Sequence, residues 1–164
     1  EEIAEHAGYG QATVFFHFKT KAGLLEACLD EALSRAKANL VPAENSGTID
    51  LIQRLDRAFD NSTTADFFAR MLVEFGDNST IRAVYADVHE HLRQLIAAEL
   101  TRETGVEGRR AYLAAASILA MMVGIHAEQR LELTRFTRSD FREMLIEVTR
   151  LVLSDLKKPA GTGP

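Results

Sequence analysis

The sequence predicts an all-α fold, and three observations lead to this prediction. No segment alternates apolar and polar residues for long enough to form a half-buried strand. Apolar residues instead recur three and four positions apart over most of the chain, which is the spacing of an amphipathic helix. Proline occurs only at positions 42, 159 and 164, so long stretches contain no helix-breaking proline.

Turn and capping residues divide the chain into helices. The first helix is expected to end near residue 7, because Gly8 can adopt the left-handed conformation that follows many helices. A short helix is expected over 11–18, and Thr20 is the expected N-cap of a longer helix that reaches about residue 40. The remaining helices are expected over 48–61, 65–75, 80–103, 109–133 and 139–156.

Length, charge and cysteine content restrict the class of protein. The 164 residues suffice for a small domain and a larger one. The single cysteine, Cys28, excludes an internal disulfide and favours the reducing cytoplasm, and its position on an apolar stripe predicts a core residue. The net charge of −5 disfavours nucleic-acid binding over the whole surface but permits a small DNA-binding face. We expect no membrane-spanning helix, because no apolar run approaches the roughly 20 residues needed to span a bilayer.

The last two helices are expected to form a homodimer. Residues 111–127 are apolar almost all round, so this helix needs cover on most of its sides. Gly124 and several alanines would let another helix approach closely. Two copies of the helices at 109–133 and 139–156 would meet this need as a four-helix bundle between subunits. The alternative is a central helix in a monomeric bundle.

The most specific motif of the chain lies in residues 3–25. They read Ile-Ala-x-x-Ala-Gly and, after a turn, Thr-Val-Phe-Phe-His-Phe-Lys-Thr-Lys-x-x-Leu-Leu. This segment resembles the helix-turn-helix signature of the TetR family of transcriptional repressors. The resemblance implies a DNA-binding head and a helical regulatory body that dimerises through its last two helices. It differs from the family pattern at Phe15, where tyrosine is usual, and at Gly10, where serine or threonine usually caps the recognition helix.

The helix at 11–18 supplies most of the expected DNA-binding residues. A glutamine can pair with adenine and a threonine methyl can touch thymine, which makes Gln11 and Thr13 candidate base readers. The candidate set is Gln11, Ala12, Thr13, Phe16, His17 and Lys21, with Lys21 placed for a phosphate at the start of the next helix. The alternative is that residues 1–18 are two packed helices of a bundle, with the aromatic cluster in its core.

Fixed positive charge is sparse in this segment. Residues 1–25 contain only two lysines, Lys19 and Lys21, against Glu1, Glu2 and Glu5. We therefore expect weak binding to nonspecific DNA. Since the chain opens in mid-helix, we also expect a preceding helix to complete the head.

In the TetR family the body holds a small molecule whose binding changes the spacing of the two heads, so the resemblance implies a ligand site. Aromatic and methionine side chains suit an apolar ligand. The candidates are Phe59, Phe68, Met71, Phe75, Tyr85, His89, Met122 and His126. The alternatives are core positions for the apolar residues, a solvated helix edge for His89 and Arg93, and a paired interface histidine for His126.

No sequence motif for catalysis or metal binding is found. The chain lacks a His-Glu-x-x-His, a phosphate-binding glycine loop and a Gly-x-Ser-x-Gly, so we expect no enzymatic activity, cofactor or metal. The acidic charge also argues against membrane binding.

The domains expected are a partial helix-turn-helix over 1–25, linked by the helix at 20–40, a regulatory and dimerisation domain over 41–157, and a disordered tail over 158–164. The predicted function is a cytoplasmic, ligand-responsive, DNA-binding regulator. It would be a repressor that a small hydrophobic molecule releases from double-stranded operator DNA. The alternative is a helical module that binds a protein or a small molecule without binding DNA.

Overall fold

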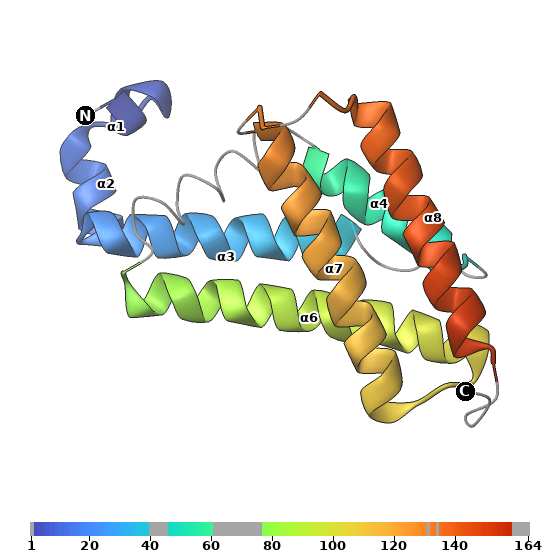
Figure 1. Ribbon diagram of the computed structural model, residues 1–164. Coiled ribbons are helices and arrows are strands. Elements are labelled where there is room, and N and C mark those ends of the chain that lie inside the picture. Colours follow the sequence, from blue (N-terminus) through green and yellow to red (C-terminus); the bar gives the residue numbers. More distant parts are fainter. Residues whose placement is uncertain (1, 40–45, 61–76, 131, 134, 159–164) are drawn as a thin grey trace.

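The computed structural model describes residues 2–39, 46–60, 77–130, 132–133 and 135–158, and all regular structure in these ranges is helical. The predicted all-α fold is confirmed (Figure 1). In chain order the helices are α1 (Glu2–His6), α2 (Gln11–Phe18), α3 (Lys21–Asn39), α4 (Thr48–Asp60), α6 (Ser79–Thr104), α7 (Gly108–Arg130) and α8 (Arg138–Leu156). The helix expected at 65–75 lies outside the described residues, as do Phe68, Met71 and Phe75.

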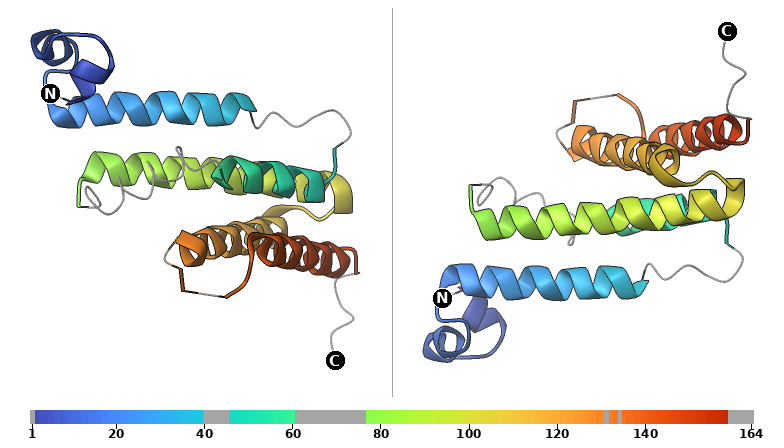
Figure 2. Two further views of the ribbon diagram at one scale, coloured as in Figure 1. Left: turned by 90° about the horizontal axis from the view of Figure 1, so that it is seen from above. Right: turned by 90° about the horizontal axis from the view of Figure 1, so that it is seen from below.

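The helices form three layers (Figure 2). α3 lies in one outer layer, with α1 and α2 at the end where α3 begins. α4 and α6 occupy the middle layer, and α7 and α8 lie side by side in the opposite outer layer. The helix-turn-helix and the α7–α8 pair are therefore on opposite faces of the middle layer.

Capping residues explain where the helices begin and end. Gly8 and Gly105 follow α1 and α6 with φ angles of 72° and 73°, in the left-handed region that glycine adopts most easily. The side chain of Asn78 accepts hydrogen bonds from the first backbone N–H groups of α6. Thr137 and Asp140 form a capping box at the start of α8, in which each side chain accepts from the other residue's backbone N–H. Several predicted boundaries therefore lie within one residue of those observed.

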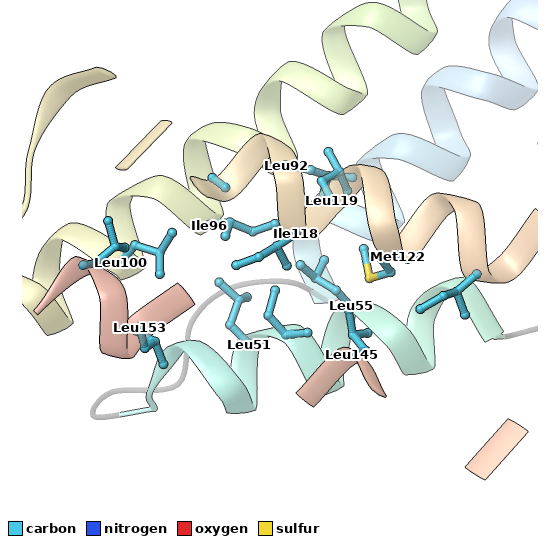
Figure 3. Packing of buried hydrophobic residues seen from close by; sticks show 14 of the residues in the cluster. Leu51, Leu55, Leu92, Ile96, Leu100, Ile118, Leu119, Met122, Leu145 and Leu153 are labelled. Atoms are coloured by element: carbon cyan, nitrogen blue, oxygen red, sulfur yellow. The ribbon is translucent and has the colours of Figure 1, made fainter. Parts of the chain in front are cut away.

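One hydrophobic core joins α4, α6, α7 and α8 (Figure 3). The side chains labelled in Figure 3 point toward one another from these four helices: Leu51, Leu55, Leu92, Ile96, Leu100, Ile118, Leu119, Met122, Leu145 and Leu153. Burying one aliphatic side chain of this size contributes about 1.5–3 kcal/mol. The body is therefore held mainly by this core, while α3 contacts it through α6.

Polar contacts fasten the start of α4 to the end of α6. The carboxylate of Glu103 accepts a hydrogen bond of 3.0 Å from the backbone N–H of Thr48 and lies 3.4 Å from the ammonium group of Lys157. Burial alone would raise the pKa of Glu103, but these contacts outweigh it and hold the pKa below its usual value. Glu103 thus serves as the N-terminal cap of a neighbouring helix.

The structure corrects two sequence expectations. The first is the expectation that no segment could span a bilayer. By length and composition, Gly108–Gln129 of α7 is apolar enough to cross a membrane, because the few weakly polar residues within it leave its mean hydropathy at 1.5. One side of α7, with Ile118 and Met122, packs into the core, as core helices of comparable composition do. Cys28 is exposed rather than buried, because α3 lies in an outer layer.

Candidate nucleic-acid interface

The predicted DNA-binding residues lie on α2 and at the start of α3. Those on α2 are exposed, and Lys21 is exposed at the first position of α3; the full set is Gln11, Ala12, Thr13, Phe16, His17 and Lys21. The ring of Phe16 stands edge-on to that of His17, with centroids 5.7 Å apart. An accessible helix side that carries hydrogen-bonding and apolar groups is suited to the edges of bases in the major groove.

The opposite side of α2 is anchored to the neighbouring helices. Val14 and Phe18 are half-buried, and with Ala4 and Leu24 they line a largely apolar hollow of about 270 Å³ between α1, α2 and α3. The polar residues Gln11, Thr20 and Lys21 also border this hollow. Phe15 also borders this hollow but is 58% exposed. These exposures do not fit the alternative in which the whole aromatic cluster is the core of a bundle.

The two ends of α2 are held by different contacts. Gly10 precedes it in an extended conformation and makes no side-chain cap, as the sequence predicts. At the other end, Lys19 adopts a φ of 58° and its N–H donates to the carbonyl of Phe15 at 2.8 Å. The N–H of Thr20 donates to the carbonyl of Phe18 at 2.6 Å. The path of α2 therefore depends on its connection to α3.

The start of α3 brings a positive charge beside α2. The hydroxyl of Thr20 accepts a hydrogen bond of 2.9 Å from the N–H of Gly23, which confirms Thr20 as the N-cap of α3. Lys21 follows directly, and its ammonium group adds to the positive end of the helix dipole. This combination is suited to a DNA phosphate.

The structure describes five of the ligand-site candidates of the body. Four of them form two pairs of contacting rings, and the fifth lies in the core. Phe59 and His126 are stacked, with ring centroids 5.7 Å apart and an angle of 23° between the planes. Tyr85 and His89 meet edge to face at 6.3 Å on α6. Met122 is fully buried in the core, as its alternative reading predicts.

His126 also belongs to a charged network that the sequence analysis missed. Its Nε2 lies 3.2 Å from Oδ1 of Asp56, off the direction of a hydrogen bond. Nε of Arg142 donates to Oδ2 of Asp56 at 3.0 Å. Burial alone would raise the pKa of Asp56, but these two partners hold it below its usual value. The signal for this site was present, since Asp56 shares the apolar stripe of α4 with Ile52 and Phe59.

Arg93 belongs to a second polar cluster, which is centred on the carboxylate of Glu90. The carboxylate of Glu90 accepts hydrogen bonds from Tyr112 at 2.6 Å, Gln94 at 3.0 Å and Arg93 at 3.1 Å. Burial lowers the pKa of the neighbouring His89, and the charge of Arg93 lowers it further. His89 is therefore a neutral, half-buried donor or acceptor at neutral pH.

The comparisons with known proteins agree with this geometry. Residues 1–28 match the family model of the bacterial regulatory proteins of the tetR family. The chain carries a TetR-family DNA-binding head. The match confirms the resemblance found in residues 3–25 and supports a DNA-binding transcriptional regulator, a class of protein without enzymatic activity.

The fold of the whole chain is also similar to that of a solved structure. The crystal structure of a Rhodococcus sp. protein, assigned to the TetR-family transcriptional regulators, matches it with a TM-score of 0.71 at 21% identity. The match covers 92% of this chain and 85% of the Rhodococcus chain. No curated protein matches the sequence.

Proposed function

We propose that this TetR-family regulator is a dimeric repressor that reads its operator with α2 and leaves it when a small molecule binds. One observation carries the DNA-reading part: α2 exposes Thr13, Phe16 and His17, while Val14 and Phe18 lie half-buried on its other side. A helix anchored in this way can enter a major groove without exposing its apolar side.

Each exposed residue has a role that its chemistry supports. Gln11 can donate to and accept from an adenine edge, and the methyl groups of Ala12 and Thr13 can touch thymine. His17 and Phe16 lie further along α2, where they can reach a base edge or a sugar. Lys21 would neutralise a phosphate and thereby set the register of α2 in the groove.

The proposed dimer uses the uncovered sides of α7 and α8. Small residues Ser117, Ala120 and Gly124 are exposed at helical spacing on α7. Leu113 on α7 and Leu151 on α8 are 50% and 61% exposed. A second copy of the chain, packed through the same two helices, would cover this apolar surface.

The proposed ligand is a small hydrophobic molecule bound in the body. Half-buried Phe59, Tyr85 and His89 offer apolar surface and a neutral polar group, with His126 stacked on Phe59. The candidates Phe68, Met71 and Phe75 complete the proposed set, and Met122 is assigned to the core. Such a ligand acts as an inducer only if it binds the released conformation more tightly than the DNA-bound one.

Footprinting on the promoter next to the protein's own gene tests the proposal. We expect two protected half-sites whose centres lie about one helical turn, roughly 34–36 Å, or a multiple of it apart. The affinity should fall as salt increases, since phosphate contacts release counterions. The proposal fails if the full-length protein shows no sequence-selective binding. The alternative helical module would then be supported if the protein retains a protein partner or binds a small molecule.

A further inference from the structure

The backbone at Gly23, in the first turn of α3, leaves no room for a side chain. A Cβ atom at this position would lie 2.5 Å from the carbonyl oxygen of Phe18 and 3.3 Å from Oγ1 of Thr20. Contacts shorter than 3.0 Å are essentially never made by real Cβ atoms. Because the Phe18 oxygen belongs to the backbone, it cannot turn away as a flexible side chain can. The first turn of α3 therefore packs directly on the last residue of α2.

This close approach is the reason for a glycine within the helix. Glycine stabilises a helix less than alanine does, because its backbone loses more freedom on folding. The φ of Gly23 is not in the positive region, so the helix itself does not require glycine here. Helix propensity thus favours alanine at position 23, whereas the contact with α2 excludes it.

The connection between the two helices is short and bonded at every step. Only Lys19 and Thr20 separate α2 from α3. Thr20 both donates its N–H to the Phe18 carbonyl and accepts from the N–H of Gly23 through its hydroxyl. At the start of α2, Gly10 provides no side-chain cap, and backbone hydrogen bonds from Gly8 to Glu5 and from Tyr9 to Ala4 close the turn to α1. The connection to α3 is therefore the one that combines backbone and side-chain hydrogen bonds with a direct backbone contact.

We propose that Gly23 is a positioning residue for DNA reading. By allowing the backbone of α3 to pack on the Phe18 carbonyl, it determines the angle between α2 and α3 and makes them move as one rigid unit. The inference rests on the proposed reading of DNA by α2.

The test compares Gly23→Ala with Gly10→Ala in the full-length protein. Gly10→Ala is the matched control, because a Cβ there would meet only Oγ1 of Thr13, at 4.0 Å. The probes are a duplex selected from a random library by the wild-type protein and a scrambled duplex of the same composition. We expect Gly23→Ala to lose about tenfold or more in affinity for the selected duplex, as when a base contact is misplaced. Binding to the scrambled duplex and the helical circular dichroism should stay as in the wild type, and Gly10→Ala should retain both affinities within about threefold.

A second measurement tests the geometry without DNA. Spin labels on Ala12→Cys in α2 and Ser34→Cys in α3, in a Cys28→Ser background, report the distance between the two helices. Gly23→Ala should shift or broaden this distance, while Gly10→Ala should not.

Two results would overturn the inference. The first is a Gly23→Ala protein with unchanged affinity for the selected duplex and an unchanged spin-label distance. The second is an equal loss of affinity for both duplexes together with lost helicity, which would show that Gly23 serves folding only. If the wild-type protein selects no sequence, the proposed function fails. The spin-label distance then still decides whether Gly23 sets the angle between α2 and α3.

Discussion

Arg142 on α8 and Asp56 on α4 are joined by a hydrogen bond of 3.0 Å across 86 positions of the sequence. The side chain of Asp56 is only 10% exposed and also faces His126 on α7. One acidic side chain therefore connects the middle layer to both helices of the outer layer that we propose to dimerise. Such a buried charge is stabilising only while its partners remain in place.

Asp56→Asn should lower the free energy of unfolding by about 1–3 kcal/mol, since it leaves the guanidinium of Arg142 without its counter-charge. The lower part of this range is expected, because the Arg142 side chain is 42% exposed and solvent screens it. Urea unfolding of the two proteins gives the difference. Asp50→Asn is the matched control on the same helix, as its ion pair with Arg54, in which the Asp50 side chain is 47% exposed, contributes less than about 1 kcal/mol. Equal losses in the two variants would contradict the network.

Acid should weaken the protein partly through the same carboxylate. The pKa of Asp56 is lower in the folded chain than its usual 3.8, so the unfolded chain binds the proton more readily. Its contribution is therefore complete well above pH 3.8 and is lost as the pH falls through the lower folded value. Glu103, whose pKa is also lowered, acts in the same direction from its usual 4.5 downward. Urea midpoints between pH 6 and pH 2 should fall less steeply in Asp56→Asn than in the wild type, and parallel curves would refute this.

Sequence reasoning succeeded where the determinants are local. The residues that flank α2 and the capping pair of Thr137 and Asp140 act within a few positions of one another. Periodicity also placed Leu55 and Leu145 correctly in a core. It could not tell which apolar stripes would meet, and for that reason it put Cys28 inside and overlooked the bond between Asp56 and Arg142.

The candidate site could likewise be predicted only where its determinants are local in the sequence. The exposed residues of α2 could be predicted because the motif determines which side of a short helix is anchored. The close approach at Gly23 could not, since it depends on the path that the chain takes between α2 and α3. From sequence alone Gly23 is only a weak helix former.

Gln11→Ala and Lys21→Ala should weaken DNA binding in different ways. Loss of a bidentate base contact should cost about 1–3 kcal/mol on the selected duplex and little on a scrambled one. Loss of a phosphate contact should weaken binding to both duplexes alike and reduce the slope of log affinity against log salt by about 1. Fluorescence anisotropy over a salt series separates the two effects. Lys158→Ala, an exposed lysine just beyond α8, is the control and should leave the slope unchanged. Identical behaviour of Gln11→Ala on both duplexes would remove Gln11 from the base-reading set.

The outer surface of α7 and α8 gives a prediction about assembly. Leu113→Glu and Leu151→Glu replace apolar side chains, which are half or more exposed in the single chain, by charged ones. In a monomer these substitutions should change the free energy of unfolding by no more than about 0.5 kcal/mol. In the proposed dimer each charge would be buried next to a second copy of the same surface without a partner.

We therefore expect sedimentation equilibrium to show a dimer for the wild type and a monomer for either leucine variant. The monomers should also bind the selected duplex more weakly, because their two heads are no longer linked and each half-site must be bound separately. Ser34→Glu, on the exposed side of α3 in the opposite layer, is the control and should remain dimeric. A wild-type protein that sediments as a monomer at all concentrations tested would instead support the monomeric bundle, with the apolar side of α7 open to solvent.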